Sequence, residues 1–130
     1  MRMLLAAVGV VVAAALPVAA QAAATETNFL VQTTGDLVEL CSPAANDALA
    51  TAAVHFCEGY GVGVFQTYNA IAAAGGAPRI YCLPQPSPTR TQAFAAFVQW
   101  ARAHPERLSE PPTDGLIRFL SERYPCSGAH

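Results

Sequence analysis

Two side chains at helical spacing, His55 and Glu58, are the first candidates for chemistry in this sequence. Residues three positions apart share one face of a helix, so this imidazole and this carboxylate could bind a metal ion weakly or transfer a proton. A metal site needs a third ligand, and the sequence nominates none. We therefore interpret the pair as part of a solvated helix face, and we predict no catalytic residue, no metal site and no cofactor.

Four cysteines are the other reactive side chains: Cys41, Cys57, Cys82 and Cys126. A thiol could act as a nucleophile, as a zinc ligand or as one half of a disulfide. Zinc sites usually draw on close pairs such as Cys-x-x-Cys, whereas successive cysteines here are separated by 16, 25 and 44 positions. The choice between free thiols and disulfides depends on the compartment that the chain enters.

The N-terminus indicates that compartment, because it has the three parts of a secretory signal peptide. A positive charge at Arg2 precedes an unbroken run of apolar residues and Gly from Leu4 to Leu16, and small residues follow Pro17. This layout predicts a signal peptide over residues 1–22, with cleavage somewhere after Ala20 to Ala24. The run is shorter than the ~20 residues that a membrane span needs, so an uncleaved anchor is the lesser alternative. We expect export to the periplasm and a soluble product.

The exported part is the size of one domain, and we predict a single helical domain over residues 25–130. It keeps six arginines against nine acidic residues, a net charge of −3 before histidine, and it contains no lysine. A mildly acidic domain without a basic run is a poor ligand for nucleic acid or for an anionic membrane. We therefore expect a protein partner, with no nucleic acid and no membrane bound after signal cleavage.

Four cysteines in a small exported domain are typical of two disulfides, which allow three pairings. We expect Cys57–Cys82 and Cys41–Cys126, because an extended return of the chain after the long helix would bring Cys82 level with Cys57. A helix beginning at Asn46 would place Cys57 about 16 Å along its axis, which strains a bridge to Cys41. The alternative set, Cys41–Cys57 with Cys82–Cys126, stays open because it needs only that the first helix cross back.

Helices must position these cysteines, since apolar residues recur at intervals near 3.6 over most of the chain. Thr89 and Gln92 form a capping box, and prolines separate the periodic stretches. The expected helices run from Thr33 or Thr34 to Cys41, from Asn46 to Ala74, from Thr89 to His104 and from Pro111 to Tyr124, with one further turn from Pro105 to Leu108. The sequence therefore predicts an all-α fold, a compact bundle of four to five helices stapled by two disulfides.

Three glycines, Gly59, Gly61 and Gly63, conflict with the longest helix, because each costs about 1 kcal/mol relative to alanine. We expect them to allow close approach of a neighbouring helix or loop. A phosphate-binding loop is the functional alternative, but no strand precedes the glycines and no Walker-type lysine follows them.

These residues together resemble the Rap/Tai family of periplasmic immunity proteins, which are linked to amidase effectors of type VI secretion. The shared string comprises Phe56-Cys57-Glu58-Gly59-Tyr60-x-x-Gly63, Cys82-Leu83-Pro84 ahead of Gln92, His104-Pro105-Glu106, and Tyr124-Pro125-Cys126. The resemblance covers the chain from about Leu37 to Cys126 and consists of residues that build a fold.

The resemblance implies a small helical protein that binds a peptidoglycan-cleaving amidase toxin in the periplasm and blocks its active-site cleft. It also implies a possible homodimer and no enzymatic activity. A general periplasmic binding domain, comparable to small helical acid-stress chaperones, is the alternative function.

The partner-binding surface that we expect is the loop from His104 to Asp114. It carries the charged residues Glu106, Arg107, Glu110 and Asp114, and three prolines stiffen it. A stiff loop loses less entropy on docking, which suits a plug for an enzyme cleft. The competing interpretation is that these prolines only end one helix and begin the next.

Overall fold

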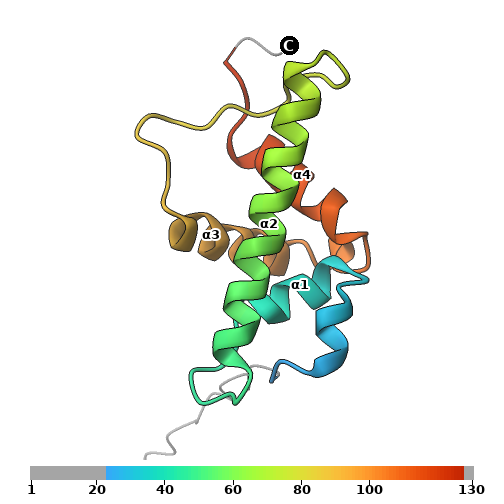
Figure 1. Cartoon of the computed structure of the whole chain (residues 1–130), viewed down its shortest axis with the longest axis vertical. Helices are drawn as coiled ribbons and strands as arrows, with labels where there is room; N and C mark the ends of the chain where they lie inside the picture. The colour runs from blue at the N-terminus through green and yellow to red at the C-terminus, as the bar shows by residue number, and fades with distance from the viewer. Residues whose placement is uncertain (1–22, 128–130) are drawn as a thin grey trace, which may run out of the picture.

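Four α-helices and two short 3-10 helices form the part of the chain that the computed structural model describes, residues 23–127 (Figure 1). They are η1 Glu26–Leu30, α1 Thr34–Cys41, α2 Ala50–Ala73, α3 Arg90–Ala103, η2 Pro105–Arg107 and α4 Pro112–Arg123. Residues 23–127 contain no strand, so the predicted all-α fold is confirmed. The predicted signal peptide, residues 1–22, lies outside the described residues.

Reciprocal caps fix the beginnings of α1 and α3. Thr33 accepts a hydrogen bond from the backbone N–H of Asp36, and the Asp36 carboxylate accepts one from the N–H of Thr33. Burial raises the pKa of the Asp36 carboxyl, but hydrogen bonds from Asn28 and Thr33 outweigh burial and hold this pKa below its ordinary value. The predicted capping box of Thr89 and Gln92 begins α3 in the same way.

The start of α2 differs from the prediction, because the helix begins at Ala50 rather than at Asn46. Asp47 holds the preceding loop instead. One of its carboxylate oxygens accepts the N–H of Leu49 at 2.8 Å, and the other accepts the N–H of Ala24 at 2.7 Å. The far end agrees with the prediction, since α2 ends at Ala73 and Gly75 follows with a φ of 79°.

The later start of α2 explains why the expected disulfide pairing, Cys57–Cys82 with Cys41–Cys126, is wrong. The bridges are Cys41–Cys57 and Cys82–Cys126, with Cα–Cα distances of 5.2 and 4.8 Å. Residues 42–49 form a loop rather than helical turns, so the end of α1 folds back against the second turn of α2. The chain after α2 returns only along the C-terminal half of that helix, where Tyr81 contacts Phe65 and Tyr68, and does not reach Cys57. It crosses to the end of α4, where the N–H of Cys82 donates to the carbonyl of Tyr124 at 2.8 Å.

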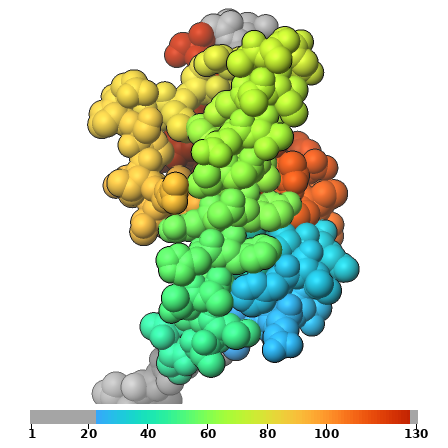
Figure 2. Space-filling view, in the orientation of Figure 1, coloured from blue at the N-terminus to red at the C-terminus, as the bar shows by residue number. Residues whose placement is uncertain are grey.

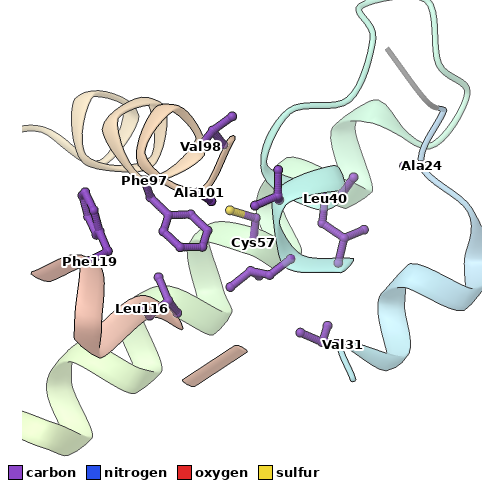
Figure 3. Close-up of a cluster of buried hydrophobic side chains, with 12 residues drawn as sticks. Ala24, Val31, Leu40, Cys57, Phe97, Val98, Ala101, Leu116 and Phe119 are labelled. Carbon is purple, nitrogen blue, oxygen red and sulfur yellow. The ribbon is translucent and has the colours of Figure 1, made fainter. Parts of the chain in front are cut away.

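The core lies around α1, which contacts α2, α3 and α4 (Figures 1 and 3). Leu37 and Leu40 of α1 are fully buried, as is Phe97 of α3. Phe97 meets Phe119 of α4 edge to face, with ring centroids 5.6 Å apart. The eight-residue helix α1 is therefore the central element of the core, and its apolar side chains pack against the three longer helices.

One buried polar side chain ties α1 to the segment before α4. The hydroxyl of Thr34 is inaccessible to solvent and donates to the backbone carbonyl of Glu110 or Pro111, at 3.1 and 3.2 Å. Gly115 of α4 lies so close that an added Cβ would come within 2.7 Å of the Thr34 methyl group. The contact between α1 and α4 therefore requires a glycine at this position.

Only the N-terminal half of α2 is embedded in the bundle, and its C-terminal half extends beyond it (Figure 1). The connector, residues 77–89, covers one side of this extension. Tyr81 of the connector is buried against Phe65 and Tyr68, and its hydroxyl donates to the Asn69 side chain at 3.1 Å. Ile71 also lies on this extension and is 46% exposed.

Candidate functional site

The loop between α3 and α4 holds three of the four residues predicted to bind a partner, and the fourth, Asp114, lies in the first turn of α4; the structure places the loop firmly against α1. The N–H groups of Thr34 and Gly35 donate to the carbonyls of Glu110 and Leu108, both at 2.8 Å. The N–H groups in the first turn of a helix have no acceptor within that helix, and the backbone carbonyls of the loop supply two of the missing acceptors for α1. The loop is therefore held by the N-terminus of a core helix as well as by its own prolines.

Two of the predicted residues, Arg107 and Glu110, hold the loop together internally. The guanidinium of Arg107 donates to Glu110 at 2.7 Å, and Arg118 of α4 approaches the other carboxylate oxygen at 3.4 Å. The hydrogen bond from Arg107, followed by the charges of both arginines, holds the pKa of Glu110 below its ordinary value. The same hydrogen bond raises the pKa of Arg107. These two side chains are largely engaged inside the protein, which the sequence did not indicate.

The other two predicted residues, Glu106 and Asp114, point toward solvent. The Glu106 side chain is 60% exposed and makes only a loose ion pair with Arg107, at 3.6 Å. Asp114 is exposed, and its carboxylate makes no hydrogen bond or ion pair with any residue from 23 to 127. The loop and the first turn of α4 thus present two available carboxylates on a braced backbone.

A groove of about 500 Å³ lies between α2 and α4, next to the start of α4. Its lining consists of Gly59, Tyr60, Gly63, Val64, Thr67, Tyr68, Ile71, Thr113 and Ile117. The Tyr60 hydroxyl and the Thr113 hydroxyl lie 3.1 Å apart and join the two walls. Nothing lies within 4 Å of a Cβ built at Gly59 or Gly63, so these glycines leave the groove open instead of admitting a neighbouring helix.

The expected close approach at the glycines occurs only at Gly61. A Cβ there would lie 2.5 Å from the ring of Phe94, so the absence of a side chain lets α3 pack onto α2. The sequence showed one apolar stripe along α2 and could not show that Val64 and Ile71 lie in an open groove. The open glycines beside this stripe are the signal that could have revealed it.

The candidates for chemistry form no reactive constellation in the structure. His55 is exposed on α2, one turn before Glu58. Within residues 23–127, no cluster of three or more His, Cys, Asp or Glu side chains could hold a metal ion. All four cysteines are paired. No helix in the same range is both long enough and apolar enough to cross a membrane.

Comparison with known proteins links this architecture to one family. The family model of the Rap1a immunity proteins matches residues 33–126. The matched segment begins at the cap of α1 and ends at the last cysteine, so it includes all four α-helices and both disulfides. Neither the curated protein sequences nor the solved structures yielded a match.

Proposed function

Because the chain belongs to the Rap1a immunity protein family, we propose that it binds a secreted toxin and blocks it sterically, without chemistry of its own. The toxin that we propose is a peptidoglycan amidase. The match over residues 33–126 carries this proposal, because it spans all four α-helices rather than one motif.

The proposed contact surface combines the loop carboxylates with the neighbouring groove. Glu106 and Asp114 supply exposed charge, and the groove between α2 and α4 supplies apolar area. Thr113 links the two, since it lines the groove and directly precedes Asp114. An apolar centre with a polar rim is the usual anatomy of a protein interface. The hydrogen bonds that brace the loop reduce the entropy lost on docking.

Inhibition of a peptidoglycan amidase, sought first among the products of the neighbouring genes, tests the proposal. Glu106→Lys, Asp114→Lys and Gly63→Trp each change the proposed surface without entering the core. We expect the double variant that combines Glu106→Lys with Asp114→Lys to raise the inhibition constant at least tenfold. In the proposed complex the two carboxylates would face positive charge on the toxin, and the lysines would repel it. Gly63→Trp should have a similar effect, because the indole would occupy the groove. Melting temperatures should stay close to that of the parent.

The matched control is Glu26→Lys, which makes the same charge change at an exposed position on η1. It should inhibit like the parent protein. Full inhibition by all three surface variants would place the interface elsewhere. Absence of an amidase among the neighbouring gene products, or of binding to it at micromolar protein, would remove the amidase from the proposal and favour the chaperone-like alternative.

We further propose export to the periplasm with cleavage after Ala22, which would leave Ala23 as the first residue. Of the expected sites, Ala24 argues against the last one, because its side chain packs in the core at 6% exposure and its N–H donates to Asp47. Cleavage after Ala24 would remove these contacts.

Light scattering of the mature protein tests the homodimer that the family resemblance implies.

A further inference from the structure

A second cavity, of about 290 Å³, opens between α2, α3, α4 and the connector. The buried rings of Phe97 and Phe119 lie at its base, and the connector contributes Leu83 and Pro88. Figure 2 shows a hollow between the yellow connector and the green α2, with dark red atoms from near the C-terminus of the described chain at its base. The cavity and the groove are lined by different residues of α2, so they are separate sites.

The lining of this cavity is apolar apart from a few polar groups, and it contains no acidic side chain. Arg90 is its only charged residue, and Gln66 adds one amide. Arg90 is the first residue of α3, and no acidic residue follows in the first turn of that helix. Its guanidinium makes no ion pair and no hydrogen bond with any other described residue. A positive charge beside the positive end of a helix dipole favours an anion.

We propose that this cavity binds a small monocarboxylate with an apolar chain or ring. The apolar part would lie against Phe97 and Phe119, and the carboxylate would pair with Arg90 in the planar geometry that a guanidinium offers. A cavity of ~150 Å³ accommodates benzene, and ligand sites usually begin near ~300 Å³, so this one fits a ligand of roughly ten heavy atoms. The inference is independent of the toxin, since it requires no partner protein.

Octanoate and 1-octanol are suitable probes, because they differ in charge but share the same chain. Each is titrated into the mature, disulfide-bonded protein below its micelle-forming or solubility limit, and amide chemical shifts are followed by NMR. We expect octanoate to shift the amides of Gly61 and Ala93 and to bind at least tenfold more tightly than 1-octanol. Arg90→Gln should remove that difference, whereas Arg79→Gln, the same charge change on the connector outside the cavity, should leave it unchanged.

Ala93→Phe supplies a second, independent variant, because its ring would fill the cavity from a half-buried position on α3. It should abolish octanoate binding while the protein keeps its parental helical circular dichroism. Equal binding of octanoate and 1-octanol by the parent protein, or a tenfold preference for octanoate that persists in Arg90→Gln, would overturn the proposed anion selectivity. No shifts at Gly61 and Ala93 with octanoate would overturn the site itself. If only a bound toxin moved these two amides, the cavity would be a socket for a protein side chain, and the proposal would be wrong.

Discussion

Two glycine-to-alanine substitutions should change stability in opposite directions, although they add the same methyl group to a helix. Gly115 lies at the contact between α4 and α1, where a Cβ would come within 2.7 Å of the Thr34 methyl group and nearer still to its hydroxyl. Gly63 lies over the open groove, where a Cβ meets nothing within 4 Å. The two sites differ in their tertiary contacts, because only the site at Gly115 has another helix within reach of an added methyl group.

The expected magnitude at Gly115 has three parts. Overpacking a core costs ~1–3 kcal/mol. Displacing the Thr34 hydroxyl from the carbonyls of Glu110 and Pro111 costs ~1 kcal/mol more, since the hydroxyl is fully buried. Better helix propensity returns ~1 kcal/mol. Gly115→Ala should therefore lower the free energy of unfolding by about 2 kcal/mol, whereas Gly63→Ala should raise it by ~0.5–1 kcal/mol.

Urea and thermal unfolding measure both changes. At ~4–8 °C per kcal/mol for a domain of this size, Gly115→Ala should lower Tm by roughly 10–15 °C, and Gly63→Ala should raise it by several degrees. Combining Gly115→Ala with Thr34→Ala should cost less than the sum of the two single substitutions, because the second relieves the contact that the first creates. A Gly115→Ala protein as stable as the parent would refute the close packing of α1 against α4.

Three further predictions follow from the caps, the bridges and the N-terminus. The depressed pKa of Asp36 contributes stability above its unfolded pKa and loses it as the pH falls through the folded value, so Asp36→Asn should weaken the loss of stability below about pH 4 in acid titrations followed by circular dichroism. Non-reducing peptide mapping should yield Cys82 joined to Cys126, and replacing both with serine should cost ~2–4 kcal/mol in urea unfolding; a peptide joining Cys57 to Cys82 would contradict the fold. Intact mass of the periplasmic protein should correspond to a chain beginning at Ala23, and a chain beginning at Thr25 would mean that the contacts of Ala24 are dispensable.

Much of the architecture was predictable from the sequence, because it depends on neighbours in the chain. The capping box at Thr89 and the stop at Gly75 need only residues within one helical turn, and both predictions are confirmed. The all-α fold followed from periodicity, and the resemblance in the cysteine, glycine and proline string agrees with the family match. The start of α2 was predicted wrongly, and the reason also lies among neighbouring residues. The Asp47 carboxylate accepts the N–H of Leu49 and so stabilises the loop before α2 instead of beginning the helix.

Only the tertiary structure decided which distant residues meet. Sequence spacing gave no measure of how the loop before α2 folds back, so the pairing of Cys41 with Cys57 could not be derived from the length of a helix. The charges of Glu106 and Glu110 look alike in the sequence, yet one is exposed while the other is bound between two arginines, because the position of Arg118 depends on how α4 packs. Likewise, a single apolar stripe runs along α2, and the length of the bundle that covers it determines which part becomes core and which part remains an open groove.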